Sequence, residues 1–217
     1  HSFPTRRSSD LNLWAGGDKG WLQRWDGAKW TYVDSKLTAA IRGIAGSGAN
    51  DVWAVGDSGG ISHFDGTAWT AMSNGYKMNA VYAAAPDKAW AVTNNGYVLV
   101  WDGVRWSPTY LGGYPQYGIW GQNATNIWTV GYYYAYHFDG SSWTPFTTGA
   151  STLYAVYGID DKNIWAAGDQ GNIVRWDGAM WSAAIVGNDP NITYRGLWGT
   201  PEFLPFFGGS GPRGPVT

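Results

Sequence analysis

Five side chains that recur at one position of a repeating sequence could together bind a ligand. Arg42, Asn79, Tyr117, Tyr154 and Arg195 follow one another at spacings of 37, 38, 37 and 41 residues. Arginine and asparagine supply hydrogen-bond donors, and tyrosine combines a large rigid ring with a hydroxyl group. These residues vary while the positions around them are fixed. Such variation is what a recognition surface would show, but it is also what a position that merely tolerates solvent would show.

A run of tyrosines adds to this candidate site. Residues 131–136 read GYYYAY where the other copies of the repeat read GDKG, GDSG, TNNG or GDQG. The pattern predicts that Tyr132 and Tyr133 lie in a hairpin on the same side as the five residues above. Exposed tyrosines suit sugars and peptide partners. Ordinary packing within a shortened turn is the alternative.

Three aspartates and two histidines are the other groups that could act as acids, bases or metal ligands. Asp18, Asp57 and Asp169 are equivalent residues of the GDxG motif, so we expect them to cap turns in separate repeats. His63 and His137 also share one repeat position, and we expect them at the surface or at a strand edge rather than around one metal ion. The sequence therefore predicts no catalytic residue, no metal and no cofactor.

The elements that position these residues come from an internal repeat. A tryptophan opens each copy, at Trp14, Trp53, Trp90, Trp128 and Trp165. An Asp-Gly pair follows in each copy, beginning at Asp26, Asp65, Asp102, Asp139 and Asp177. Four residues after each of these aspartates comes another tryptophan, at Trp30, Trp69, Trp106, Trp143 and Trp181.

Each copy is typical of four short antiparallel strands. In the fifth copy the predicted strands are residues 153–158, 163–168, 172–177 and 180–184, with GDxG and DGxxW as the hairpins between them. Aspartate can accept hydrogen bonds from backbone N–H groups across such a turn, and glycine supplies the positive φ. A repeated four-stranded unit predicts an all-β protein with a β-propeller of about five four-stranded antiparallel blades.

The composition supports this class and excludes several partners. The chain has 32 Gly, 16 Trp and 14 Tyr among 217 residues, and Glu202 is its only glutamate. The net charge is −2 without a basic stripe, so nucleic acid is not expected as a partner. There is no Cys, which excludes disulfides and thiolate metal sites. Apolar stretches are strand-sized, so no membrane span is expected.

A family resemblance rests on the phrase VWAVGDSGGISHFDGTAW at residues 52–69. It resembles the bacterial neuraminidase-type repeats and the related photosystem II assembly-factor-like repeats, whose blades carry a GxxGxI hairpin followed by DG and Trp. The resemblance implies a propeller but no particular function, because such blades occur in hydrolases, assembly factors and surface proteins. The DGxxW turn is shorter than the SxDxGxTW box of the sialidases, which argues against transferring sialidase activity.

Three segments are predicted along the chain. Residues 1–11 resemble a translated sequencing adapter, which makes them non-native and indicates a metagenomic source. Residues 12–202 form the propeller, either closed with residues 195–199 completing the first copy or as part of a larger propeller. Residues 203–217 are expected to be an irregular tail, because Pro205, Pro212 and Pro215 interrupt the strand pattern.

The function that these observations favour is recognition without catalysis. We expect a module of a secreted or surface bacterial protein, outside the cell or in the periplasm, that binds a glycan or a protein. A sialidase-like remnant is one alternative, although the acid–base pair is missing because Glu202 falls on the wrong connection. A purely structural spacer is the other alternative.

Overall fold

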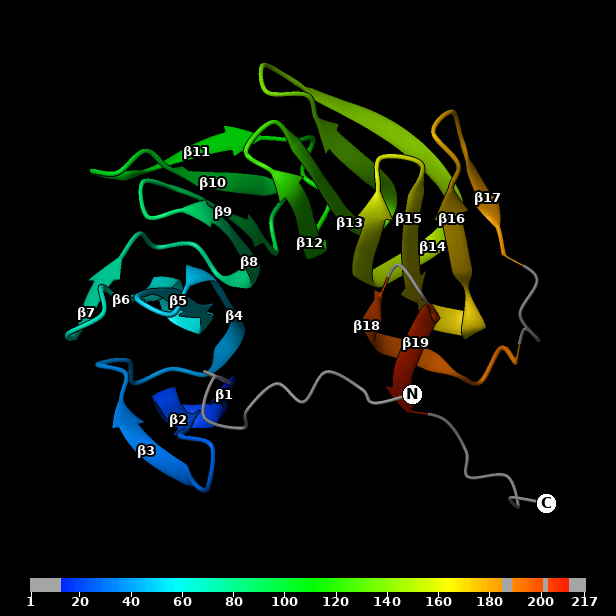
Figure 1. The fold of residues 1–217 in the computed structure, drawn as a ribbon. Helices are drawn as coiled ribbons and strands as arrows, with labels where there is room; N and C mark the ends of the chain where they lie inside the picture. Colours follow the sequence, from blue (N-terminus) through cyan, green and yellow to red (C-terminus); the bar gives the residue numbers. More distant parts are fainter. Residues whose placement is uncertain (1–12, 185–188, 201–202, 211–217) are drawn as a thin grey trace. The chain divides into compact units, whose positions relative to one another are not determined.

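Strands make up most of the described structure, and turns and loops connect them. The computed structural model describes residues 13–184, 189–200 and 203–210. Within these ranges it contains three single turns of 3-10 helix, at Asp18–Gly20, Asp57–Gly59 and Asp169–Gly171, and otherwise strands β1 to β19 (Figure 1). In this part of the chain no helix is long and apolar enough to cross a membrane. The predicted all-β class is confirmed, while the adapter-like residues 1–11 lie outside the described residues.

The chain forms two compact units. The first comprises the residues up to Trp90 together with Trp101–Trp106, and the second comprises Ala91–Val100 and the residues from Ser107 onward. The first unit holds a three-stranded sheet of β1 (Leu13–Gly16), β2 (Trp21–Trp25) and β3 (Trp30–Asp34). It also holds a four-stranded sheet of β4 (Ile41–Gly48), β5 (Asp51–Gly56), β6 (Gly60–Phe64) and β7 (Trp69–Ser73).

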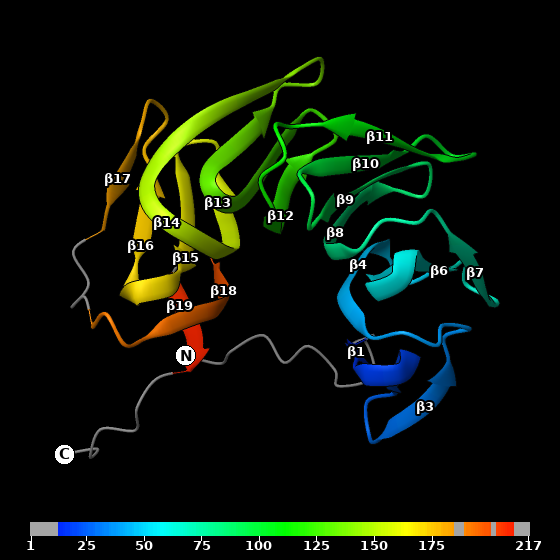
Figure 2. The ribbon, with the colours of Figure 1, turned by 180° about the vertical axis from the view of Figure 1, so that it is seen from behind.

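The other sheets follow the same order along the chain. The next four-stranded sheet is β8 (Met78–Ala85), β9 (Lys88–Thr93), β10 (Tyr97–Trp101) and β11 (Trp106–Tyr110). A six-stranded sheet follows, with β12 (Gln116–Asn123), β13 (Asn126–Phe138), β14 (Trp143–Asp160), β15 (Asn163–Gly168), β16 (Ile173–Trp176) and β17 (Trp181–Ala183) (Figure 2). The four strands predicted for the fifth copy are found in β14 to β17.

The length of β13 hides a hairpin. Trp128 stacks on His137 with ring centroids 4.4 Å apart, although nine residues of straight strand span roughly 30 Å. The chain therefore reverses between them, at Tyr133, whose φ is 65°. Lys19, Ser58 and Gln170 have φ values of 55°, 58° and 58° at the equivalent position of the GDxG hairpins. The tyrosine hairpin thus keeps the backbone conformation of the motif that it replaces.

One segment predicted to be irregular is instead a strand. Residues 203–210 form β19 (Phe203–Ser210), which pairs antiparallel with β18 (Thr193–Thr200). The register shifts between Trp198, opposite Phe206, and Thr200, opposite Phe203, so β19 carries an extra residue where Pro205 lies. Such a bulge leaves a residue outside the ladder, which accommodates a proline without an N–H group. The prediction was wrong for 203–210, and residues 211–217 lie outside the described residues.

The Asp-Gly turns behave as the sequence predicts. In each of the five, the aspartate Oδ1 accepts hydrogen bonds from the backbone N–H groups two and three residues further on, at 2.8 to 3.0 Å. The following glycine has a φ between 95° and 101°. The pKa of all five carboxyl groups lies below the usual range: at Asp65 the largest cause is the bond from the Thr67 hydroxyl, and at the other four it is these backbone bonds. The turn fixes the register of the third and fourth strands of each copy.

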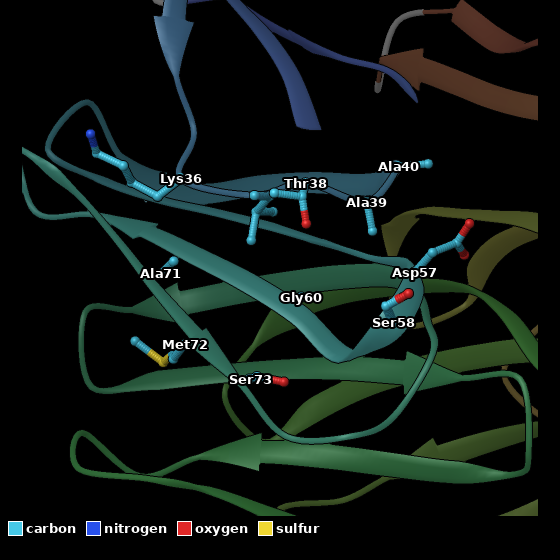
Figure 3. A pocket seen from close by; sticks show the side chains of 11 residues that line it. Lys36, Thr38, Ala39, Ala40, Asp57, Ser58, Gly60, Ala71, Met72 and Ser73 are labelled. Carbon is cyan, nitrogen blue, oxygen red and sulfur yellow. The ribbon is translucent and has the colours of Figure 1, made fainter. Parts of the chain in front are cut away.

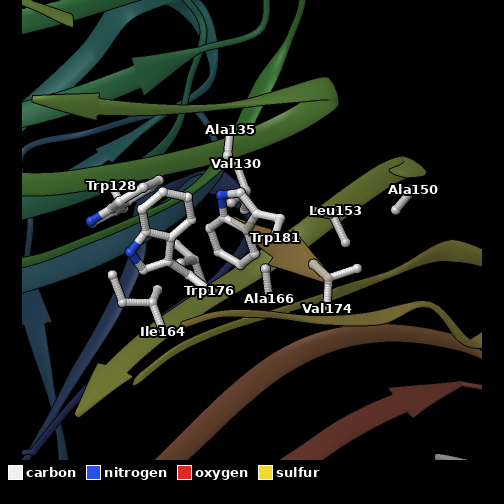
Figure 4. Packing of buried hydrophobic residues seen from close by; sticks show 11 residues of the cluster. Trp128, Val130, Ala135, Ala150, Leu153, Ile164, Ala166, Val174, Trp176 and Trp181 are labelled. Carbon is white, nitrogen blue, oxygen red and sulfur yellow. The ribbon is translucent and has the colours of Figure 1, made fainter. Parts of the chain in front are cut away.

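Packing between neighbouring copies explains the tryptophans. In the first unit, Trp53 lies 5.1 Å from Trp106 with the rings at 89°, and it also contacts Trp101. In the second unit, Trp128 meets Trp176 and Trp181 in the same way, the latter edge-on at 79° (Figure 4). The opening tryptophan of one copy therefore packs against the aromatic pair around the Asp-Gly of the next. Edge-on contacts of this kind add to the hydrophobic gain of burying large rings.

Small residues let the inner strands of these copies approach closely. A Cβ atom added to Gly43 would lie 2.8 Å from the Cα atom of Ala80, and one added to Gly118 would lie 2.9 Å from the carbonyl oxygen of Tyr154. Both distances are too short for real side chains. The next residue toward the N-terminus on each strand, Arg42 or Tyr117, belongs to the candidate site, so close backbone packing fixes where these side chains start.

Candidate functional site

The seven residues expected to bind a ligand fall in both units. Arg42 and Asn79 belong to the first unit, whereas Tyr117, Tyr132, Tyr133, Tyr154 and Arg195 belong to the second.

In the first unit Arg42 takes part in an ion-pair network. Its Nη2 lies 2.7 Å from Oδ2 of Asp57, and Nζ of Lys77 lies 3.2 Å from Oδ1 of the same carboxylate. The hydrogen bond from Arg42 is the main cause that lowers the pKa of Asp57, and the same bond raises the pKa of Arg42. Asn79 lies half-buried on β8. Arg42 is exposed but already engaged, which limits its freedom to bind a ligand.

In the second unit three of the predicted residues stack. The rings of Tyr117 and Tyr154 are 5.1 Å apart, and the guanidinium carbon of Arg195 lies 4.5 Å from the ring centroid of Tyr154. An arginine over a tyrosine face is held by cation–π attraction. The two tyrosines are half-buried and Arg195 is exposed. The structure thus brings together residues that the sequence separates by up to 78 positions, from Tyr117 to Arg195.

Asp169 holds Tyr154 of this stack in place through a hydrogen bond. Its Oδ2 accepts a hydrogen bond from the Tyr154 hydroxyl at 3.0 Å, and its Oδ1 accepts one from the Thr193 hydroxyl at 3.1 Å. Burial, followed by the bond to Asp169, raises the pKa of Tyr154, so its hydroxyl keeps its proton at neutral pH. The carboxylate orients the ring on which Arg195 lies.

The role expected for Asp57 and Asp169 is therefore corrected. Neither carboxylate caps its own turn; each turn is closed by the backbone, as in the 3.0 Å bond from the N–H of Asn172 to the carbonyl of Asp169. Each carboxylate instead bridges the residue fifteen positions earlier and a residue at the beginning of the next inner strand. For Asp57 these are Arg42 and Lys77, which directly precedes β8; for Asp169 they are Tyr154 and Thr193, the first residue of β18. The shared spacing of fifteen was a signal in the sequence that turn chemistry alone does not explain.

The tyrosine hairpin forms the exposed part of the second unit's site. Tyr132 and Tyr133 are 36% and 47% exposed, and the hydroxyl of Tyr132 donates to that of Tyr133 at 3.1 Å. Tyr114 packs against both rings, at 6.1 and 5.9 Å. The pKa of Tyr132 is raised by the bond with Tyr133 first and then by the nearby hydroxyls of Tyr114 and Tyr117. We call Tyr114, Tyr117, Tyr132, Tyr133, Tyr154 and Arg195 the tyrosine cluster.

A buried glutamine holds the loop that carries Tyr114. The side chain of Gln116 is fully buried; its Oε1 accepts from the Thr129 hydroxyl at 2.7 Å, and its Nε2 donates to the carbonyls of Tyr114 and Pro115 at 3.4 and 3.2 Å. Tyr114, Gln116 and Asp169 were not among the predicted site residues. For Gln116 the sequence did offer a signal, namely a polar glutamine at the start of a buried strand.

The two histidines have a packing role in separate units. His63 stacks on Trp53 at 3.9 Å, and its Nε2 lies 2.6 Å from Oδ1 of the buried Asp51. His137 stacks on Trp128, and burial lowers its pKa. Both are half-buried rather than at the surface, because each imidazole stacks on a tryptophan that belongs to the core. Among the described residues, no group of three or more histidine or acidic side chains could hold a metal ion.

No protein-family model matches the chain, and no curated protein matches it in sequence. Among solved structures, "YCF48 from Cyanidioschyzon merolae" superposes with a TM-score of 0.69 at 17% identity, covering 91% of this chain and 74% of that one. The chain has a β-propeller fold.

A second solved structure gives the same result. "YCF48 bound to D1 peptide" superposes with a TM-score of 0.65 at 15% identity and covers 86% of this chain and 67% of that chain. The resemblance to photosystem II assembly-factor-like repeats is thus confirmed for the fold. The neuraminidase-type resemblance finds no such support. At these identities the likeness concerns the backbone, so function has to be argued from this chain's own side chains.

Proposed function

We propose that this chain is a non-catalytic β-propeller module that binds a peptide segment of a partner protein through the tyrosine cluster of its second unit. The observation that carries the proposal is the exposure of Tyr132 and Tyr133 beside the stacked Tyr117, Tyr154 and Arg195. Tyrosine and arginine are the residue types that dominate binding energy in protein interfaces. Exposed rings that are already packed against one another also lose little conformational entropy on binding.

The solved relative adds support of another kind. A protein of the same fold is described as bound to a D1 peptide, so this fold offers surfaces that can hold a peptide. The groups of this chain that could act as acids or bases also support a role without catalysis. Asp57 and Asp169 bridge other side chains, and His63 and His137 stack on core tryptophans. Glu202, the residue on which a sialidase-like alternative depended, lies outside the described residues.

The test uses a displayed library of short linear peptides selected on the full chain. Peptides bound at the tyrosine cluster should lose at least about tenfold in affinity with Tyr133→Ala or Arg195→Ala. Tyr32→Ala is the matched control, because Tyr32 is an exposed tyrosine, 53% accessible, in the first unit. Equal losses in the control would contradict the proposal.

A glycan array tests the competing ligand class, carbohydrates. Binding of a glycan that Tyr133→Ala abolishes, with no peptide enriched, would make the module a carbohydrate binder. Retention of the folded state in each variant is checked by its thermal melting curve.

A further inference from the structure

A pocket in the first unit lies beside the outermost strand of a blade. It has a volume of about 430 Å³. One wall is the connection between β3 and β4, residues 36–40, and the opposite wall consists of Ala71, Met72 and Ser73 of β7 (Figure 3). The hairpin residues Asp57, Ser58 and Gly60 lie at one end. None of these residues belongs to the tyrosine cluster.

The connection that forms the first wall is fixed at both ends. The Ser35 hydroxyl donates to the carbonyl of Gly20 at 2.6 Å and is itself buried. At the other end the carbonyl of Ala40 accepts from the N–H of Asp57 at 3.0 Å. Between these anchors Leu37 packs against the core cluster of the first unit. The pocket is therefore preformed rather than dependent on a mobile loop.

β7 presents backbone groups to this pocket. It is the last strand in the order β4, β5, β6, β7, and it pairs with β6 through Ser62 opposite Ala71 and Ile61 opposite Met72. The N–H of Asp65 donates to the carbonyl of Ala68, which sets the alternation of the antiparallel ladder. By that alternation Thr70 and Met72 bond to β6, while the N–H and C=O groups of Ala71 and Ser73 point away from the sheet. Both of these residues line the pocket.

Two of the four sister repeats protect the same edge position with a proline. The residue two places after the Asp-Gly tryptophan is Pro108 in β11 and Pro145 in β14, but Ala71 in β7. A proline has no N–H group, and on an edge strand it prevents another chain from pairing. Tyr32 and Ala183 occupy the position in the two remaining copies. Among these positions without a proline, Ala71 of β7 is the one that lines the pocket.

The charges around the pocket define what can enter it. Nζ of Lys36 is 2.6 Å from Oδ2 of Asp34, and Asp57 is bound by both Arg42 and Lys77. The two charged residues that line the pocket, Lys36 and Asp57, are thus each paired within the chain. The rest of the lining is uncharged: it includes the apolar side chains of Leu37 and Met72, small alanines, and the hydroxyls of Thr38 and Ser73. An uncharged side chain complements such a lining, whereas a charged one would lose hydration without gaining a partner.

From this geometry we infer that β7 and the pocket form a second peptide site, which binds an extended segment of a partner protein by strand addition. The segment pairs with the outward N–H and C=O groups of Ala71 and Ser73, and an uncharged side chain of the segment enters the pocket. Strand addition supplies affinity through main-chain bonds and specificity through such a pocket. The site does not depend on the tyrosine cluster.

The test is a selection of short linear peptides displayed on phage, run in parallel on the full chain and on its Ala71→Pro variant. Proline at this position occurs in two sister strands, so the variant should fold, which its circular dichroism and melting curve check. Peptides of the second site should be enriched only on the unaltered chain. In solution they should bind Ala71→Pro at least about tenfold more weakly, and Ala71→Ser, which keeps the N–H group, with unchanged affinity.

Two results would overturn the inference. One is a selection that yields no peptide distinguishing the unaltered chain from Ala71→Pro. The other is self-association of the chain that Ala71→Pro abolishes, since the edge would then pair with a second copy. Peptides that lose affinity with Tyr133→Ala but not with Ala71→Pro belong to the tyrosine cluster, so the two sites succeed or fail separately.

Discussion

At the scale of single residues, Tyr133 combines a strained backbone conformation with an exposed ring. Its φ of 65° lies in the left-handed region, which costs a residue with a Cβ atom roughly 1–2 kcal/mol. The sequence predicted an exposed hairpin tyrosine here, and the structure shows a side chain that is 47% exposed and hydrogen-bonded to Tyr132. A glycine would be the simpler choice for the backbone. Lys19, Ser58 and Gln170 adopt nearly the same φ in other copies, so the strain belongs to the repeat, and the large exposed ring is what distinguishes Tyr133.

Two variants separate these contributions. Tyr133→Ala removes the ring but keeps the strain, whereas Tyr133→Gly removes both. We expect the glycine variant to be the more stable of the two by about 1 kcal/mol, because relief of strain is partly offset by the greater entropy of glycine in the unfolded chain. Urea denaturation measures this difference. Both variants should lose peptide binding equally; a glycine variant that retains binding would show that the ring is not the contact.

The carboxylate of Asp57 should make stability depend on pH. Its pKa in the folded protein lies below the value of about 3.9 in an unfolded chain. The ionised form therefore stabilises the fold at neutral pH, and this contribution is lost as the pH falls below about 4 toward the folded-state pKa. Asp57→Asn should melt a few degrees lower than the unaltered chain at pH 6, and the two melting curves should converge at acidic pH. A difference that persists unchanged at low pH would show that the charge is not responsible.

At the scale of elements, most of the fold follows from local pattern. The predicted strand at 163–168 coincides with β15, and the Asp-Gly turns have the expected hydrogen bonds, because glycine and aspartate fix these conformations within a few residues. The strand at 203–210 was missed because Pro205 suggested a break, while pairing with β18 tolerates it at a bulge. The bridges of Asp57 and Asp169 were missed for a related reason: they join three segments, and turn propensity describes only one.

The alternation along β7 can be measured directly. The N–H groups of Thr70 and Met72 should exchange slowly with solvent deuterium because they bond to β6, whereas those of Ala71 and Ser73 should exchange quickly because they point outward. Amide exchange followed by nuclear magnetic resonance tests this in the absence of any ligand. Equal protection of all four amides would mean that the edge is already covered, and strand addition at β7 would then be excluded.

At the scale of the whole molecule, equivalent positions in the repeat are not equivalent in energy. Neighbouring copies bury aromatic residues against one another, so the stability of a stacked array depends on the contacts between copies. Trp30 and Trp69 occupy the same repeat position in the first unit, yet Trp30 is 44% exposed and Trp69 only 7%. Trp69 receives Trp14 edge-on at 5.1 Å and 79°, whereas Trp30 contacts Trp25 within its own sheet. The sequence column alone predicts equal roles.

Alanine substitutions should reveal this difference. Trp69→Ala removes a buried ring and leaves a cavity between two sheets, which should cost about 3–5 kcal/mol of unfolding free energy. Trp30→Ala removes a half-exposed ring and should cost about 1 kcal/mol. Denaturant midpoints of the two variants, compared at equal slopes, give both values. Equal losses would mean that Trp30 is as deeply packed in solution as Trp69, and that burial between copies extends to the outer face of the β1–β3 sheet.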